Sequence, residues 1–356
     1  MIADQRWAVR ADSSVQMGAG HLMRCLTLAQ QAHGHGAEVA FICADLPGNL
    51  SALVTQQGFG LHLLPGPATG DMHAPFDWAG DAAQTLAAAG TQPWDWLVAD
   101  HYSIDARWET TLRPMARHIL AIDDLADRGH DCDVLLDQNY YPGLEHRYDA
   151  LVPPACRKLL GPRYLLLRPE FTEARRRLAR HTGEVRRILV NFGGTDEANI
   201  TDLALDAIAL LARPGIAVDV VIGSTTPHRA ATEARIAALP GAQLHVQTSR
   251  MAELIASADL AIGACGSSTW ERCCLGLPTL ALVLADNQRQ GAAALHAAGI
   301  IVNLGEAQAM MPAALAAATA GLMADRAARL ALSERSLALG ADTGPDLIDL
   351  LVGAGT

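Results

Sequence analysis

The sequence lacks a basic block, a long apolar run and a common metal-binding spacing. Its 27 Lys and Arg residues are outnumbered by 38 Asp and Glu residues, giving a formal net charge of −11. A broad nucleic-acid footprint needs clustered cations, so we expect no nucleic-acid partner. The apolar runs, such as residues 280–285, fall far short of the ~20 residues that span a bilayer, so we expect no membrane span.

Cysteine usage and the first residues favour a cytoplasmic protein. The seven cysteines are odd in number and scattered, which suits reduced thiols. No CxxC and no HExxH occurs, so these templates give no structural zinc site. Residues 1–7 contain an acid and no apolar stretch, unlike a signal peptide.

The 356 residues suffice for about two domains, and a half-apolar composition with 18% charged residues excludes a disordered chain. In both halves apolar segments alternate with helical stretches, which is typical of parallel α/β sheets. The expected strands are 7–11, 39–43, 61–64, 96–99, 118–122, 188–192, 218–222, 260–262 and 279–283. The Ala-rich segment 307–335 is expected to be helix, because Ala has the highest helix propensity.

These patterns predict an α/β protein with two doubly wound, Rossmann-type domains that face each other across a cleft. We place the first domain at residues 1–168 and the second at residues 188–356. Between them, residues 169–187 are rich in Arg and Glu and are expected to form a helical linker. The last helix is expected to pack back on the first domain.

A glycine-rich loop follows the first expected strand. Gly18 and Gly20 permit close backbone approach to a ligand, and the helix that follows would point its amides toward the strand ends. His21 stands at the start of that helix, where the helix dipole disfavours its protonation, as a general base requires. Arg24 can reach a phosphate or pair with an acid such as Asp12. The alternative is an ordinary turn with a surface histidine.

Acids and a tyrosine follow two other strands of the first half. Asp100 and Tyr102 come directly after one strand and Asp123 after the next. Such positions border the crevice in which open α/β sheets bind ligands. Tyr102 is a candidate to assist an acid or a base, whereas the aspartates have the alternative of capping helices.

In the second half, residues 263–271 join a strand to a helix. Gly266 permits close approach to a diphosphate, and the hydroxyls of Ser267, Ser268 and Thr269 can donate to it without a metal. Glu271 follows in the first helical turn and can accept from two vicinal ribose hydroxyls. The alternative for Glu271 is a capping role.

Two further loops are candidates in this half. Gly194 lies in a Gly-Gly-Thr-Asp segment that either approaches the same diphosphate or forms a tight turn with an N-cap. Asn287 and Gln288 follow another strand and carry side-chain amides that can hydrogen-bond a nucleotide or a sugar. A plain polar loop is the alternative there.

Several motifs in one order resemble a known family. The segments are 10–12, 18–28, 122–128, 136–140, 160–164, 192–196 and 265–271. Together they resemble the UDP-2,4-diacetamido-2,4,6-trideoxy-β-L-altropyranose hydrolases of pseudaminic acid biosynthesis, over about residues 8–290. More distantly, Glu271 and its spacing to residues 276–278 are similar to the lipid-II-forming N-acetylglucosaminyltransferase, whose corresponding Glu binds the nucleotide ribose.

The resemblance implies a GT-B-like architecture, with a catalytic N-terminal domain and a UDP-binding C-terminal domain. It implies hydrolysis of a UDP-sugar with inversion at the anomeric carbon, without a metal or a cofactor. The catalytic histidine falls on His21 and the motif tyrosine on Tyr102, with Asp12 nearby, and Asn139 is carried over as a substrate-binding residue. The expected partners are the UDP-sugar and the UDP product, and the chain is expected to be a monomer or a weak homo-oligomer.

Two other functions remain open from the sequence. A GT-B glycosyltransferase would use an acceptor hydroxyl in place of water, and a binding subunit would hold UDP without chemistry. Turnover without an acceptor separates a hydrolase from these two.

Overall fold

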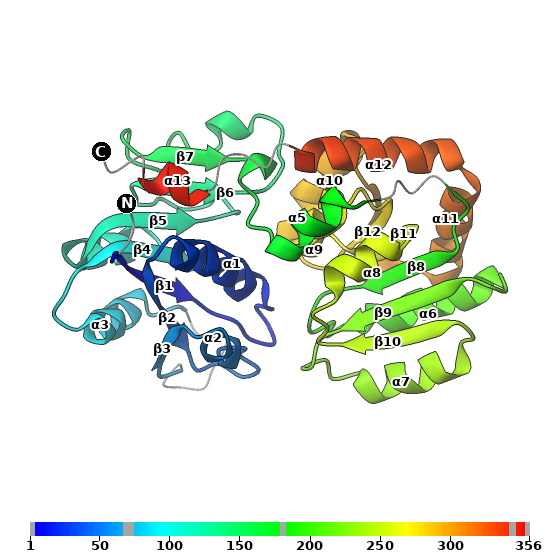
Figure 1. The fold of residues 1–356 in the computed structure, drawn as a ribbon, viewed down its shortest axis with the longest axis horizontal. Coiled ribbons are helices and arrows are strands. Elements are labelled where there is room, and N and C mark those ends of the chain that lie inside the picture. Colours follow the sequence, from blue (N-terminus) through cyan, green and yellow to red (C-terminus); the bar gives the residue numbers. More distant parts are fainter. Residues whose placement is uncertain (1–3, 67–74, 179–182, 342–346, 353–356) are drawn as a thin grey trace. The chain divides into compact units, whose positions relative to one another are not determined.

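The computed structural model describes residues 4–66, 75–178, 183–341 and 347–352. The chain divides into two compact units (Figure 1). The first comprises the residues up to Asn139, Gly143–Leu166 and the C-terminal helix α13 (Leu347–Val352). The second comprises Tyr140–Pro142 and the residues from Leu167 through helix α12 (Arg326–Ala341).

The first unit is built on a parallel sheet of seven strands in the order β3-β2-β1-β4-β5-β6-β7. Its strands are β1 (Arg6–Ala11), β2 (Glu38–Ala44), β3 (Gly60–Leu64), β4 (Trp94–Asp100), β5 (Ala116–Ile122), β6 (Val134–Asp137) and β7 (Arg157–Leu160). Its other helices are α1 (Gly20–Gly34), α2 (Ala52–Gln56), α3 (Trp78–Ala89) and α4 (Ala106–Leu112). The strand order reverses direction between β1 and β4, which is the switch point where such sheets bind ligands.

Alternate residues of β1 explain why both faces of this sheet are covered. Trp7 and Val9 belong to a buried cluster with α1 and with Leu347, Ile348 and Leu351 of α13. Ala8, on the opposite face, belongs to a second cluster with residues of α3 and α4. Side chains of a strand alternate between faces, so a strand buried on both sides is mostly apolar, and in β1 the buried exception is Arg10.

The second unit has a parallel sheet of six strands in the order β10-β9-β8-β11-β12-β13. Its strands are β8 (Arg187–Asn191), β9 (Ala217–Ile222), β10 (Ala242–Val246), β11 (Leu260–Ala264), β12 (Thr279–Val283) and β13 (Val302–Glu306). Its other helices are α5 (Pro169–Arg176), α6 (Ile200–Leu211), α7 (Arg229–Ala238), α8 (Met251–Ser257), α9 (Ser268–Cys274), α10 (Arg289–Ala297) and α11 (Pro312–Ala324). Here the switch point lies between β8 and β11.

Two expected segments differ in detail from the structure. The stretch 169–187 begins with α5, whose Phe171 is fully buried in a core cluster of the second unit. The Ala-rich stretch forms two helices, α11 and α12, with a break at Asp325, because Asp325 Oδ1 accepts from the Ala328 amide and so starts a new helix. Across the residues that the structure describes, no helix is long and apolar enough to cross a membrane.

Candidate functional site

The loop after β1 and the end of β4 meet at the switch point of the first unit. The register pairs Ala11 of β1 with Asp100, the last residue of β4. Gly18 adopts a φ of 77° and donates its amide to Ser14 O at 2.9 Å, which closes a turn just before α1. The second residue of α1 is His21, so the chain brings this histidine to the end of β4.

His21 and Asp100 form a buried pair. His21 Nδ1 lies 2.5 Å from Asp100 Oδ1, and the two side chains are 4% and 0% exposed. Burial alone would raise the pKa of Asp100, but the Arg24 guanidinium and His21 hold it well below its usual range. Since an ionised carboxylate only accepts, Nδ1 must carry the proton that is donated to Asp100. Neutral His21 therefore has its lone pair on Nε2, which is buried and has no hydrogen-bond partner among the described residues.

Arg24 holds this pair in place from the next turn of α1. Its Nε donates to Asp100 Oδ2 at 2.6 Å and its Nη2 to Oδ1 at 2.7 Å. Nη1 pairs with Asp124 at 3.2 Å. The acids that pair with Arg24 are thus Asp100 and Asp124, and Asp12 has a different partner.

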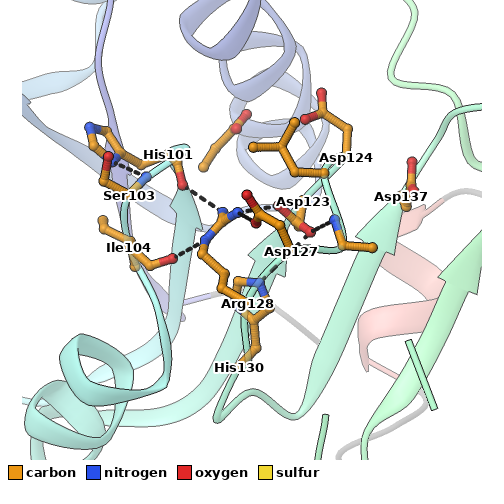
Figure 2. A network of polar contacts seen from close by, with 12 residues as sticks. His101, Ser103, Ile104, Asp123, Asp124, Asp127, Arg128, His130 and Asp137 are labelled. Carbon is orange, nitrogen blue, oxygen red and sulfur yellow. Dashed lines mark hydrogen bonds and ion pairs between the residues drawn. The ribbon is translucent and has the colours of Figure 1, made fainter. Parts of the chain in front are cut away.

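Tyr102 lies against the ring of His21. The two ring centroids are 4.3 Å apart and the planes are inclined by 83°, an edge-on contact. Arg128 fixes the backbone on both sides of Tyr102, because Nη2 donates to His101 O at 2.9 Å and Nε to Ile104 O at 2.6 Å (Figure 2). The tyrosine is therefore carried by a segment tied at two carbonyls.

Asp123 anchors Arg128 from the end of β5. Its Oδ1 lies 2.9 Å from Arg128 Nη1 (Figure 2). Its Oδ2 accepts from the Ala126 amide at 2.8 Å. Burial would raise the pKa of Asp123, but Arg128 and His130 lower it. The structure thus shows Asp123 supporting the Tyr102 segment, and its direct contact with a substrate stays a prediction.

Asp12 belongs to a buried network centred on Arg10. Arg10 Nη1 and Nη2 donate to the two oxygens of Asp12 at 2.5 and 2.9 Å, and the Ala44 amide donates to Oδ1 at 2.7 Å. His101 Nδ1 accepts from the Ser103 amide, so its proton sits on Nε2, 3.5 Å from Asp12 Oδ2. Burial lowers the pKa of His101. Through His101, these contacts connect Asp12 to the segment that carries Tyr102.

Asn139 lies just beyond β6 and contacts Asp137, the last residue of that strand. Asp137 Oδ1 accepts from the amide and the side chain of Asn139 at 2.9 and 3.1 Å, and Tyr148 donates to Oδ2 at 3.0 Å. Burial raises the pKa of Asp137 to about 6, and the neighbouring Asp124 adds to this rise.

The buried Asp137 should make the stability of the protein fall with rising pH. Its folded-state pKa lies above the unfolded value, so its contribution is fully present below about pH 4 and is lost as the pH rises through about 6. Asp137→Asn keeps the buried shape and cannot ionise. We expect the free energy of unfolding of wild type, relative to Asp137→Asn, to fall by up to about 3 kcal/mol between pH 4 and 7.5. Urea unfolding of both proteins at several pH values measures this, and parallel pH profiles would contradict it.

In the second unit, two loops meet at the switch point between β8 and β11. The register pairs Asn191 of β8 with Gly263 of β11, so the loops that begin at Phe192 and Cys265 are neighbours. A Cβ on Gly223 would lie 2.1 Å from Gly194 O, so the loop containing Gly194 is pressed against the end of β9. In this loop Asp196 accepts from the amides of Ile200 and Thr201 at the start of α6. Asp196 thus satisfies the first two amides of α6 from outside the N-cap position, which Asn199 occupies without a side-chain capping bond.

The loop 265–267 leads into α9, which begins at Ser268 and carries Thr269 and Glu271. Gly266 lies close to Gln288, because a Cβ on Gly266 would be 3.6 Å from Gln288 Nε2. Asn287 and Gln288 belong to a short 3₁₀ turn, Asp286–Gln288, and Gln288 Oε1 accepts from the Leu284 amide at 3.0 Å. The structure therefore brings Gly266 and Gln288 to one place.

Glu271 pairs with an arginine of its own unit. Its Oε1 lies 3.0 Å from Arg168 Nη2, and the two side chains are 20% and 24% exposed. Burial raises the pKa of Glu271, while Arg168 opposes that rise. One carboxylate oxygen is thus oriented by Arg168, which leaves acceptor capacity on the other.

Several buried or partly buried arginines support these sites and could not be assigned a role from the sequence. Arg10, Arg128 and Arg272 each bind the segments that carry candidate residues. A charged residue inside an apolar strand, as Arg10 is in β1, was the one available signal. The contacts of Arg128 and Arg272 depend on the fold, so the sequence gives no sign of them.

Known proteins resemble the chain in part of its sequence and in its fold. No family model matches the chain. It is 29% identical over 195 residues to the UDP-2,4-diacetamido-2,4,6-trideoxy-β-L-altropyranose hydrolase of Campylobacter jejuni, covering 54% of this chain and 61% of that protein. It is 35% identical over 148 residues to the spore coat polysaccharide biosynthesis protein SpsG of Bacillus subtilis, covering 41% and 43%. The match thus spans about half the length of these curated relatives.

Solved structures resemble the whole chain. MurG of Acinetobacter baumannii has a TM-score of 0.64 at 17% identity, covering 98% of each chain. UGT89C1 of Arabidopsis thaliana, solved in complex with UDP, has a TM-score of 0.66 at 14% identity, covering 99% of this chain and 100% of that one. At such identities the likeness concerns the fold. The chain therefore has the two Rossmann-like domains of the GT-B fold and is similar in sequence to the Campylobacter jejuni hydrolase.

Proposed function

We propose that this protein is an enzyme that hydrolyses a UDP-linked 2,4-diacetamido-2,4,6-trideoxy sugar in the biosynthesis of pseudaminic acid. Water replaces UDP at the anomeric carbon with inversion, and neither a metal nor a cofactor takes part. The observation that carries the proposal is the His21–Asp100 pair. In it, the buried Nε2 of His21 has no hydrogen-bond partner among the described residues. Sequence similarity to the altropyranose hydrolase supports the choice of substrate.

In this mechanism His21 Nε2 takes a proton from water as the water oxygen bonds to C1 of the sugar. The bond between C1 and the phosphate oxygen breaks, and its electron pair leaves with UDP. Asp100 keeps the proton on Nδ1 and stabilises the imidazolium that forms. Tyr102 supports the ring edge-on and orients the water, while Asp12 acts as a positioning residue through His101 and Arg10.

A general base supplies about 10²–10⁴ in rate, so the departing diphosphate must be stabilised as well. We assign this to the second unit, where Gly194, Gly266 and the hydroxyls of residues 267–269 bind the diphosphate. Glu271 accepts from the ribose hydroxyls, and Asn287 and Gln288 hydrogen-bond the rest of the nucleotide. The residues that we expect to contact the sugar lie in the first unit and are Gly18, Gly20, Arg24, Asp123 and Asn139.

Hydrolysis in ¹⁸O-water tests the proposal. The UDP-sugar is incubated with the protein, and both products are analysed by mass spectrometry. Label on C1 of the free sugar is expected. Label on phosphate would instead show a pyrophosphatase route, and no reaction without an acceptor would favour a glycosyltransferase or a binding subunit.

Removal of the Glu271 carboxylate should chiefly weaken nucleotide binding. We expect Glu271→Ala to raise the dissociation constant of UDP roughly tenfold or more, because hydrogen bonds to a charged group are among the stronger ones. Isothermal titration with UDP measures this. Glu253→Ala is the matched control, since Glu253 pairs with Arg250 on the surface of the same unit. An unchanged dissociation constant for Glu271→Ala would rule out the ribose role.

A further inference from the structure

Arg272 is buried in the second unit, and none of the described carboxylates pairs with it. It lies on α9 and is 1% exposed. Its Nη1 donates to Ser268 Oγ at 3.0 Å, and its Nη2 donates to Ala264 O at 2.6 Å and to Thr269 Oγ1 at 3.1 Å. The hydrogen bonds described for this guanidinium thus go to two hydroxyls and one carbonyl, and its buried Nε has no described partner.

Other buried arginines of the chain are compensated more fully. Arg10 pairs with Asp12 and Asp81, and Arg24 pairs with Asp100 and Asp124. Arg329 donates to carbonyls of Leu322 and Met323 at the negative end of α11. Burial lowers the pKa of Arg272, yet a guanidinium stays charged at neutral pH. Positive charge that no described carboxylate neutralises therefore lies beside Ser268, at the start of α9.

The hydroxyls of Ser268 and Thr269, which both accept from Arg272, differ in where their own protons are donated. A hydroxyl has one proton to donate and two lone pairs to accept. Thr269 Oγ1 donates to Ala264 O at 3.3 Å, so its proton is already used within the protein. Ser268 Oγ accepts from Arg272, and it is half-buried. Because the guanidinium cannot accept, the Ser268 proton has to point away from it.

Gly263 makes the room for this arrangement. A Cβ at this position would lie 3.0 Å from Arg272 Nη1 and 2.6 Å from Asn191 O. A side chain at the end of β11 would therefore displace the guanidinium from the switch point. The position of the Arg272 guanidinium thus depends on a glycine at residue 263 of β11.

We propose that Arg272 is a positioning residue for a nucleoside diphosphate: it supplies unpaired positive charge and makes Ser268 a dedicated donor to the diphosphate. This inference rests on the proposed function, which binds UDP in the second unit. Of the two hydroxyls at the start of α9, it makes Ser268 a more important donor to the diphosphate than Thr269. It also explains how a chain with a net charge of −11 can bind an anion at this place.

Titration of UDP and of uridine into variants tests the inference, because only UDP carries the diphosphate. Ser268→Ala is expected to raise the dissociation constant of UDP about tenfold and that of uridine less than about threefold. Thr269→Val should cost less UDP affinity than Ser268→Ala. Arg272→Lys, which keeps a charge but cannot span the same three acceptors, should resemble Ser268→Ala. Ser257→Ala, whose hydroxyl donates to Leu254 O in α8, is the matched control and should behave as wild type.

The outcomes separate this inference from the function on which it rests. If wild type binds UDP and Ser268→Ala binds it equally well, the inference is overturned and the proposed function stands. Equal losses for UDP and uridine would overturn it too, because the effect would then not concern the diphosphate. If wild type binds no UDP at all, both fail. Should Arg272→Lys not fold, as a thermal melt would reveal, the comparison of Ser268 with Thr269 still decides.

Discussion

Replacement of His21 by Asn is expected to lower kcat by about 10²–10⁴ while the dissociation constant of UDP changes by less than about threefold. The Asn side-chain amide can still donate to Asp100, so the buried carboxylate keeps a partner. It provides no basic nitrogen in the position of Nε2, so water would have to attack without a base. Single-turnover rates and titration with UDP measure the two quantities separately.

The control for His21 lies on the same helix. His33 is exposed and contacts Ala37 O, so His33→Asn should leave both quantities unchanged. If His21→Asn kept a tenth or more of the wild-type rate, His21 would not be the base. A His21→Leu variant is less informative, because it leaves the Asp100 carboxylate without its histidine.

Asp100→Asn should have the second largest effect on turnover, a loss of roughly 10² or more. An amide at this position can donate to His21 Nδ1, which would move the imidazole proton to Nε2 and remove the lone pair that the reaction needs. The same change leaves Arg24 buried with a weaker partner, so we also expect the free energy of unfolding to fall by about 3–5 kcal/mol. Rates must therefore be measured at a temperature where the variant is folded.

Asp124→Asn separates these two effects of Asp100. It removes the other carboxylate that pairs with Arg24 and leaves the contact between His21 and Asp100 in place. We expect it to lower kcat less than tenfold, whatever it does to stability. Equal losses of kcat in the two variants would show that Asp100 acts through Arg24 and not by orienting His21.

The central strands were predictable from the sequence, and most of those missed lie at the sheet edges. The expected strands 7–11, 39–43, 96–99 and 118–122 lie within β1, β2, β4 and β5, because strands buried on both faces are continuous apolar runs. The strands β7, β10 and β13 were not identified. Each lies at the edge of its sheet and contains polar or charged residues, such as Arg157 and Lys158 of β7, so no apolar run marks it.

The candidate site was predictable as a list of residues but not as a set of pairs. His21 and Asp100 were identified separately, and the sequence assigned Asp100 to substrate binding. Their contact joins residues 79 positions apart, and it depends on β4 lying beside β1. Sequence spacing carries no information on such a neighbour. For the same reason the guanidinium of Arg128 could not be assigned to the backbone around Tyr102.

Because helix α13 belongs to its core, the first unit is formed by segments that lie far apart in the sequence. Leu347, Ile348 and Leu351 of α13 fill part of the same core as Trp7 and Val9, more than 300 residues earlier in the chain. A fragment that ends near residue 166 would contain all seven strands of the sheet but not α13. The apolar residues that α13 covers would then be exposed to solvent, which promotes aggregation. A nonsense mutation that ends the chain before residue 347 would consequently damage the unit that holds His21, far from the mutation in sequence.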